Sequence, residues 1–349
     1  MVALPGASAL AVSSTPMPSS SSPVADSPPS PGSPGSAPAH PSAPARIRLT
    51  LTDSHRRPVS AVIVGERLRV VGDVRPFLAG QAVIVRFSRD GRRLGARRAT
   101  VVAAGRGRGR LAVTFAVGGH AGTIGVRVSS ASPQAPPIRT AVSRVVALPS
   151  HLSAHSSSSD IRLLQRELAG RGYAVPIDGR LDSATGRAVL AFRKLSGLSR
   201  TDLTDFALFS RMAHGGGSYP VRYPRDGRHF EADLTHQVLA EINPGGRVRR
   251  IYTMSSGKPS TPTVIGSFRI YSKQAGTNSE GMVDASYFIG GYAIHGYADV
   301  PPYAASHGCL RMPIPDAGDI FAWARVGERV DVYTHTGRGS HRVRPGVRP

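Results

Sequence analysis

The chain has one cysteine, Cys309, and two histidines precede it at short spacing. His307 lies two residues before the thiol and His295 lies fourteen residues before it. A histidine within reach of a thiol can lower its pKa or accept its proton, which makes sulfur a nucleophile for carbonyl carbons. Gly308, directly before the cysteine, permits a tight backbone conformation and close approach of a substrate. These residue types indicate a reactive thiol rather than a buried structural one.

A single cysteine also limits what the rest of the chain can be. A disulfide scaffold within one chain needs a second cysteine, and a cysteine-type structural zinc site needs several. His151 and His155 have the i, i+4 spacing of some metal ligands, but no third ligand lies near them in their serine-rich stretch. We therefore expect no metal site and no cofactor.

The residues around Cys309 closely resemble the active-site signature of the L,D-transpeptidases, the YkuD-type catalytic fold. The resemblance is carried by His295-Gly296 and by Ser306-His307-Gly308-Cys309-Leu310-Arg311-Met312. Further matches are Ser256-Gly257 and Thr261-Pro262-Thr263-Val264-Ile265-Gly266-Ser267-Phe268. It extends over roughly residues 221–333. The interval between the histidine and the cysteine is short for this family, which predicts a trimmed loop and an altered substrate groove.

The resemblance implies a role for each residue of the signature. Cys309 is implied as the nucleophile, and His295 as the general acid and base that takes its proton. The Gly296 backbone carbonyl would orient the imidazole, a task that Asp or Asn performs in other triads. Backbone N–H groups around His307, Gly308 and Cys309 are expected to form an oxyanion hole.

Several neighbouring residues each have more than one interpretation. His307 could polarise the thiol, bind substrate or support the loop, and Ser306 could brace the loop or touch substrate. Arg311 has the planar fork that suits a stem-peptide carboxylate, but it would equally suit an internal ion pair. Tyr297 and two nearby tyrosines could line the groove or simply pack.

The order of the residues separates this chain from other cysteine acyltransferases. Papain-like enzymes and related wall peptidases place the cysteine before the histidine, whereas His295 precedes Cys309 here. Sortases share the order His, Cys, Arg, but their histidine lies much further upstream and their arginine further downstream. Arg311, only two residues after the thiol, therefore argues against a sortase.

Strand patterns at both ends of the chain indicate the domains that surround this site. Ile47, Leu49 and Leu51 alternate with polar residues, and Asp90-Gly91 is a strong hairpin signal. Residues 46–148 are therefore predicted to form an immunoglobulin-like β-sandwich, a spacer or binding module. Strand patterns return in residues 215–335, the predicted β-rich catalytic domain, in which a short helix is expected over 317–324. The predicted fold is multidomain and mainly β.

A helical module is expected between these two β domains. After a linker over residues 149–158, Ser159 or Asp160 can cap a first helix, and Asp182 or Ser183 can cap a second. Residues 159–214 resemble a small three-helix peptidoglycan-binding domain. The family's second Asp-Gly turn is replaced here by Arg200-Thr201-Asp202-Leu203. A helical spacer without wall binding is the alternative.

Composition bounds the location and the partners. Residues 1–45 contain 32 Pro, Ser or Ala residues and predict a disordered tether. Residues 4–12 form a weak apolar stretch without a preceding basic residue, so a remnant of an export signal is expected. No run is apolar enough for a membrane span, and a basic tail is expected over 336–349. The net charge of +22 suggests anionic wall polymers as partners. The absence of a base-reading motif speaks against specific nucleic-acid binding.

Together these features predict an extracytoplasmic enzyme of the cell wall. The resemblance implies that Cys309 attacks the third residue of a stem peptide, releases the terminal D-alanine, and passes the acyl group to a neighbouring amine in a 3→3 cross-link. It also implies that carbapenems acylate Cys309. Two alternatives stay open from the sequence: a carboxypeptidase that uses water as the acceptor, and a wall-binding protein whose catalytic domain has decayed.

Overall fold

The computed structural model describes residues 43–133 and 136–335, which contain eighteen strands and four helices: nine strands, three helices, eight strands, a helix and a last strand in chain order. The expectation of a mainly β chain with a small helical module is confirmed. The predicted tether over residues 1–45 lies outside the described residues except for positions 43–45, and the predicted basic tail lies wholly outside them. No helix in the described ranges has the length and hydropathy of a membrane-spanning segment.

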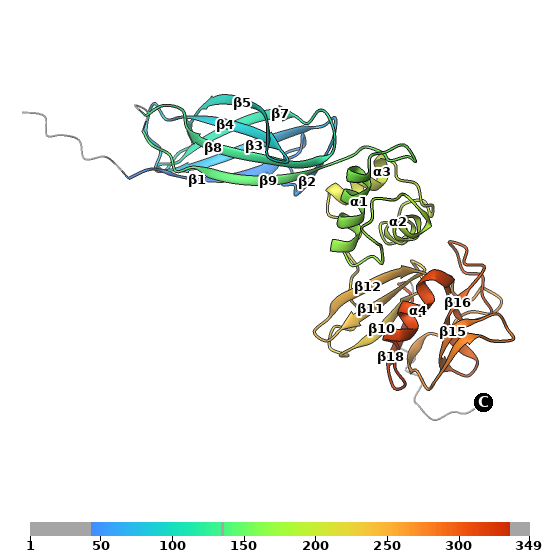
Figure 1. Ribbon diagram of the computed structural model, residues 1–349. Coiled ribbons are helices and arrows are strands. Elements are labelled where there is room, and N and C mark those ends of the chain that lie inside the picture. The colour runs from blue at the N-terminus through green and yellow to red at the C-terminus, as the bar shows by residue number, and fades with distance from the viewer. Residues whose placement is uncertain (1–42, 134–135, 336–349) are drawn as a thin grey trace, which may run out of the picture. The chain divides into compact units, whose positions relative to one another are not determined.

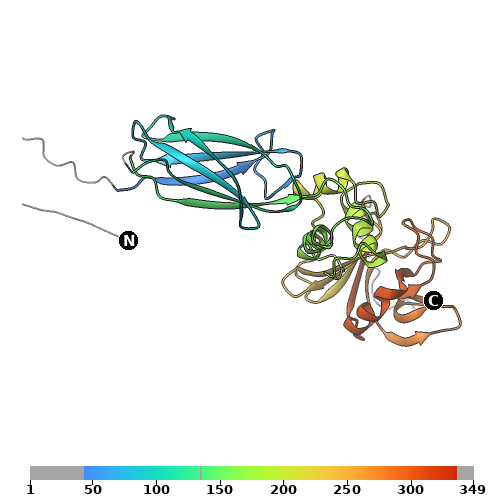
Figure 2. The ribbon, with the colours of Figure 1, turned by 45° about the horizontal axis from the view of Figure 1, so that its top comes forward.

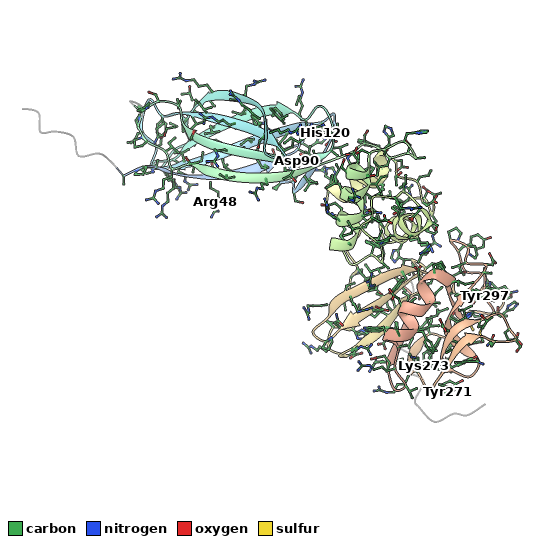
Figure 3. The ribbon with its side chains drawn as sticks, viewed as in Figure 1. Arg48, Asp90, His120, Tyr271, Lys273 and Tyr297 are labelled. Atoms are coloured by element: carbon green, nitrogen blue, oxygen red, sulfur yellow. The ribbon has the colours of Figure 1, made fainter. Side chains whose placement is uncertain are left out.

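Two sheets share one hydrophobic core in the first β domain (Figures 1 and 2). One sheet has the order β1-β3-β7-β6, with bounds Arg46–Thr52, Arg67–Arg75, Gly109–Ala116 and Val102–Ala103. The other has the order β2-β9-β8-β4-β5, with bounds Ala61–Ile63, Ala141–Leu148, Gly122–Ser130, Ala82–Arg89 and Arg92–Thr100. Alternate residues point into the core, whereas polar ones such as Arg48 point outward (Figure 3). The immunoglobulin-like class of this sandwich stays a prediction.

Three helices follow: α1 (Ser158–Gly170), α2 (Ser183–Leu195) and α3 (Phe206–Ala213). Asp182 caps α2 as expected, since its side chain accepts from the Thr185 amide. The cap expected at Ser159 or Asp160 is wrong: Ser157 caps α1, and its side chain accepts from the Asp160 amide.

The C-terminal domain is built on two sheets. One has the order β12-β11-β10-β18-β13, with bounds Arg247–Thr253, Val238–Asn243, His229–Asp233, Arg329–Tyr333 and Gly266–Arg269. The other has the order β14-β15-β16-β17, with bounds Ser272–Thr277, Val283–Ile289, Tyr292–Tyr297 and Leu310–Pro313. Apolar side chains from both sheets meet in one core. Strands β16 and β17 are parallel neighbours, and this pairing sets the position of the candidate site.

Helix α4 (Ile314–Trp323) packs against β15, β16 and β17 (Figure 1). It begins three residues before the expected start at Ala317, because Pro315 lies in the first turn, where a missing N–H costs nothing. Ala317, Ile320 and Trp323 turn toward the core. The helix therefore covers the strands that carry His295 and the residues after Cys309.

Candidate active site

Strand pairing brings the two predicted reactive side chains together. Cys309 directly precedes β17, and Ile294 of β16 is the register partner of Leu310, so His295 lies on the neighbouring strand. Both residues line one cavity of about 280 Å³. Residues 298–309, between the end of β16 and the start of β17, form the connection that a parallel pair of strands requires.

The imidazole of His295 is held in one orientation. Its Nδ1 lies 2.9 Å from the Gly296 carbonyl oxygen, which can only accept, so Nδ1 carries the proton and Nε2 is the acceptor. Burial lowers the pKa of His295; the Gly296 hydrogen bond opposes this shift, and the positive charge of Arg311 adds to it. The ring is therefore neutral near pH 7, the state in which Nε2 can accept a proton.

The thiol of Cys309 is not ionised at rest. Burial raises its pKa, although the Ala293 backbone and the Arg311 charge act in the opposite direction. Its Sγ makes a long contact of 3.7 Å, as donor, to the Gly291 carbonyl. Within the described part of the chain no hydrogen bond joins the thiol to His295. The expectation that neighbouring histidines lower the thiol pKa is thus not met, because burial has the larger effect.

Gly308 holds the loop before Cys309 in a conformation that suits glycine. Its φ of +125° is rare for other residues, and a Cβ at this position would lie 2.4 Å from the Tyr292 ring. The Gly308 amide donates to Ser306 Oγ at 3.1 Å, and that hydroxyl donates to the Cys309 carbonyl at 2.6 Å. Ser306 therefore braces the loop, which is one of the two roles expected for it.

These contacts also narrow the expected oxyanion hole. Because the Gly308 amide already donates to Ser306 Oγ, it is not free to bind an oxyanion in this conformation. In the ranges that the structure covers, the His307 and Cys309 amides have no such acceptor. These two amides are the better candidates for oxyanion donors.

Arg311 makes an internal ion pair, one of its two expected roles, and also lies at the cavity. The guanidinium lies 4.1 Å from the centre of the ring of Tyr297, which is labelled in Figure 3, and 3.7 Å from the exposed carboxylate of Asp299. It also lines the cavity with Cys309. The ion pair is long and open to solvent, so the charge stays available to the cavity. Tyr297 meets the His295 ring edge-on, with centroids 5.7 Å apart.

His307 lines the cavity but is turned toward a residue that the sequence reading missed. Its Nε2 lies 3.1 Å from Lys258 Nζ, on the exposed side of the loop. An ammonium can only donate, so His307 accepts through Nε2. This favours a binding or supporting role for His307 over polarisation of the thiol.

Sequence reasoning also missed a brace behind the loop. Thr263 Oγ1 accepts from the Gly257 amide at 2.9 Å and donates to the Gly308 carbonyl at 2.8 Å. The Ser306 amide donates to the Ser256 carbonyl at 2.9 Å. In the sequence, Ser256-Gly257 and residues 261–268 stand out only as matches to the family. Their small polar side chains were the available signal for such a brace.

The cavity does not contain a group of close metal ligands. In residues 43–133 and 136–335, the three ligating side chains that approach one another are Asp233, His236 and His335. None of them lines the cavity. The side chains that line the cavity, among them Cys309 and His295, are suited to proton transfer and nucleophilic attack.

Two family models match the chain. The L,D-transpeptidase catalytic domain (YkuD) matches residues 227–332, and a peptidoglycan binding domain matches residues 157–212. The first includes every predicted site residue and the second includes all of α1 and α2. No curated protein matches the chain.

Several solved structures are similar to it. An L,D-transpeptidase from Xylanimonas cellulosilytica is 31% identical over 53% of this chain and 98% of its own, with a TM-score of 0.49. One from Stackebrandtia nassauensis is 19% identical, covering 53% and 95%, with a TM-score of 0.35. One from Enterococcus faecium is 26% identical, covering 31% and 50%, with a TM-score of 0.28. The two domains are therefore assigned from the family models and not from these structural similarities.

Proposed function

Because the chain belongs to the L,D-transpeptidase family, we propose that it forms 3→3 cross-links between peptidoglycan stem peptides through a Cys309 thioester. The observation that supports this most is the pairing of Cys309 with an oriented, neutral imidazole in one cavity. The reaction class is acyl transfer in cell wall biogenesis, with consequences for cell wall organisation and cell shape.

The first half-reaction acylates the thiol. As sulfur attacks the carbonyl carbon of the third stem residue, its proton passes to His295 Nε2. The His307 and Cys309 amides stabilise the oxyanion, and the Arg311 charge adds to that field. When the C–N bond breaks, His295 returns the proton to the departing amine, and D-alanine leaves.

The second half-reaction transfers the acyl group. A side-chain amine of a neighbouring stem attacks the thioester carbonyl and gives a proton to His295. The C–S bond then breaks and sulfur takes the proton back, which restores the starting thiol. A neutral thiol and a neutral imidazole at rest mean that charge develops only along the reaction, where the fixed Gly296 carbonyl stabilises the imidazolium.

The helical module supports the same substrate. It matches a peptidoglycan binding domain, so the protein is proposed to act at the cell wall, outside the cytoplasm, as a secreted enzyme. Exposed arginines of the sandwich, such as those on β5, would suit contact with anionic wall polymers.

The test is mass spectrometry of the full chain incubated with a disaccharide-tetrapeptide. The expected product is a dimer that has lost one D-alanine. Cys309→Ala should give no dimer, and His295→Gln should give far less. As a matched control, His120→Ala changes an exposed histidine of the sandwich and should leave the yield unchanged.

Two other outcomes would change the proposal. Tripeptide without dimer would identify water as the acceptor and a carboxypeptidase. Unchanged tetrapeptide, from protein whose thiol still reacts with iodoacetamide, would favour a wall-binding protein with a decayed catalytic domain.

A further inference from the structure

A second group of chemistry-bearing side chains lies at one end of the five-stranded sheet. Asp233 ends β10, His236 follows three residues later, and His335 comes two residues after β18. Strands β10 and β18 are parallel neighbours, with Asp233 opposite Tyr333, so their carboxyl ends meet at one edge. One ligand atom from each of the three residues lies within 4.8 Å of the others.

The carboxylate is the fixed member of this cluster. Asp233 is fully buried, and its Oδ1 accepts from the backbone amides of Thr235 and His236 at 2.9 and 3.0 Å. Its Oδ2 faces both imidazoles, with His236 Nδ1 at 2.7 Å and His335 Nε2 at 2.8 Å. The imidazoles are 27% and 39% exposed, so an ion can reach them from solvent.

We propose that Asp233, His236 and His335 bind a divalent transition-metal cation of the Zn²⁺ type, with water completing the coordination. Two imidazoles and a carboxylate are ligands that suit zinc and its neighbours, whereas Ca²⁺ and Mg²⁺ need more oxygen atoms. A cation here takes the place of the two N–H protons that now face Oδ2, and each imidazole bound to the metal carries its proton on its other ring nitrogen.

Binding of zinc requires the three ligand atoms to move from their present spacing. Ligand atoms around tetrahedral zinc, with bonds of about 2.0–2.1 Å, lie about 3.3 Å apart. The present separations of 2.7 and 2.8 Å therefore have to open by about 0.5 Å, and the ligand atoms of the two imidazoles, which lie within 4.8 Å of each other, have to settle at that same spacing. The buried carboxylate can stay in place, because the partly exposed imidazoles are free to make this shift.

Nearby positive charges weaken the affinity of this site for a cation. Arg200 Nη2 donates to the Thr235 carbonyl at 2.8 Å, on the same turn, and the Arg222 guanidinium lies 4.8 Å over the Tyr333 ring. Three protein ligands beside two guanidinium groups bind more weakly than a closed four-ligand site.

A bound cation would stiffen a turn that supports the active-site loop. Gln237, next to His236, bonds through its side chain to the Leu234 carbonyl and to the amide and hydroxyl of Ser256. The Ser256 carbonyl in turn accepts from the Ser306 amide. The cation is therefore assigned a structural role, since none of its ligands lines the cavity of Cys309.

The test is calorimetric titration of tag-free, chelator-treated full chain with ZnCl₂. It is done in a Cys309→Ala background, so that the active-site thiol cannot bind zinc. His335→Gln is the main variant, because glutamine can keep a hydrogen bond to Asp233 but is a poor zinc ligand. His236→Ala is the second variant, and His120→Ala is the control, at an exposed position of the sandwich (Figure 3).

We expect one zinc ion per chain, a saturable rise in Tm, and at least about tenfold weaker binding in each ligand variant. Loss of even an outer-shell partner commonly costs that much. Absence of zinc binding, or equal affinity in the parent and in folded His335→Gln, overturns the proposal. Neither readout involves turnover, so either result leaves the acyl-transfer proposal to its own test.

Discussion

Replacing Gly308 by alanine tests the inference that the shape of the loop holds the nucleophile in place. An added Cβ would lie 2.4, 2.6 and 2.9 Å from three atoms of the Tyr292 ring, and the backbone has a φ of +125°. Ordinary carbon contacts begin near 3.4 Å, so the ring or the loop must shift by about 1 Å. The aromatic ring is rigid and half-buried, so the loop has to yield.

Two costs follow from this geometry. A strained backbone dihedral costs about 1–3 kcal/mol, which should lower Tm. A displacement of about 1 Å at reacting groups commonly costs about 10²-fold in rate, or about 2.7 kcal/mol of transition-state stabilisation. We therefore expect Gly308→Ala to fold, to melt earlier, and to react with tetrapeptide about 10²-fold more slowly.

Two further glycines separate the causes. Gly327 has a φ of +87° with nothing within 4 Å of its Cβ position, so Gly327→Ala carries backbone strain without a clash. Gly318 lies in α4 with open space around it, so Gly318→Ala carries neither. The assay is Cys309 acylation followed by intact-protein mass spectrometry, with thermal melts of each variant.

The expected pattern is loss of stability in Gly308→Ala and Gly327→Ala, and loss of acylation only in Gly308→Ala. Adding Tyr292→Ala to Gly308→Ala removes the clash but not the strain, and should recover part of the rate. If folded Gly308→Ala acylates at the wild-type rate, the reasoning about loop geometry fails.

Three other variants or conditions have outcomes that the structure fixes. The rate of Cys309 acylation should stay level from about pH 6.5 to 8 and fall only in acid, because the pKa of His295 is lowered from 6.5. Alkylation of Cys309 by iodoacetamide should rise only near or above pH 9, because the pKa of the thiol is raised. Thr263→Val should cost about 1–3 kcal/mol in a denaturant melt, since two buried main-chain groups lose their partner, whereas Thr277→Val, on the exposed end of β14, should cost little. Burial lowers the pKa of Lys194 from 10.5 to about 7, so between these pH values the unfolded chain binds one more proton than the folded chain. The free energy of unfolding of the wild type, relative to that of Lys194→Met, should therefore rise with pH across this window. A stability difference between the two proteins that does not change with pH would contradict this prediction.

The fold followed from sequence wherever local chemistry decides it. Asp90-Gly91 forms the expected hairpin, with φ of +47° and +84°, because few other pairs accept two positive φ values. The start of α1 was misplaced because consecutive serines offer equivalent caps, and local sequence cannot choose among them. Ser157 is selected by the helix register that buries Ile161 and Leu164.

The candidate site, too, could be predicted only in part from the sequence. Residue types and spacing pointed to Cys309 and His295, since a thiol and an imidazole are rare and chemically distinctive. The direction of the thiol pKa shift was missed, because it depends on burial by segments far away in the chain. Thr263 could not be assigned either: its hydrogen bond to the Gly308 carbonyl joins positions 45 residues apart.

The contacts of Lys194 bear on what the helical module does. Lys194 is buried in α2, and its ammonium donates to Thr253 Oγ1 at 2.7 Å and to the carbonyls of Gln237 and Met254 at 3.1 and 3.0 Å. Gln237 holds Ser256, whose carbonyl receives the amide of Ser306. The helices therefore contact the support of the active-site loop, in addition to any role in wall binding. A C-terminal domain cut away from the helices would expose these polar groups and the apolar face of β11 and β12, and so would lose packing that supports the loop before Cys309.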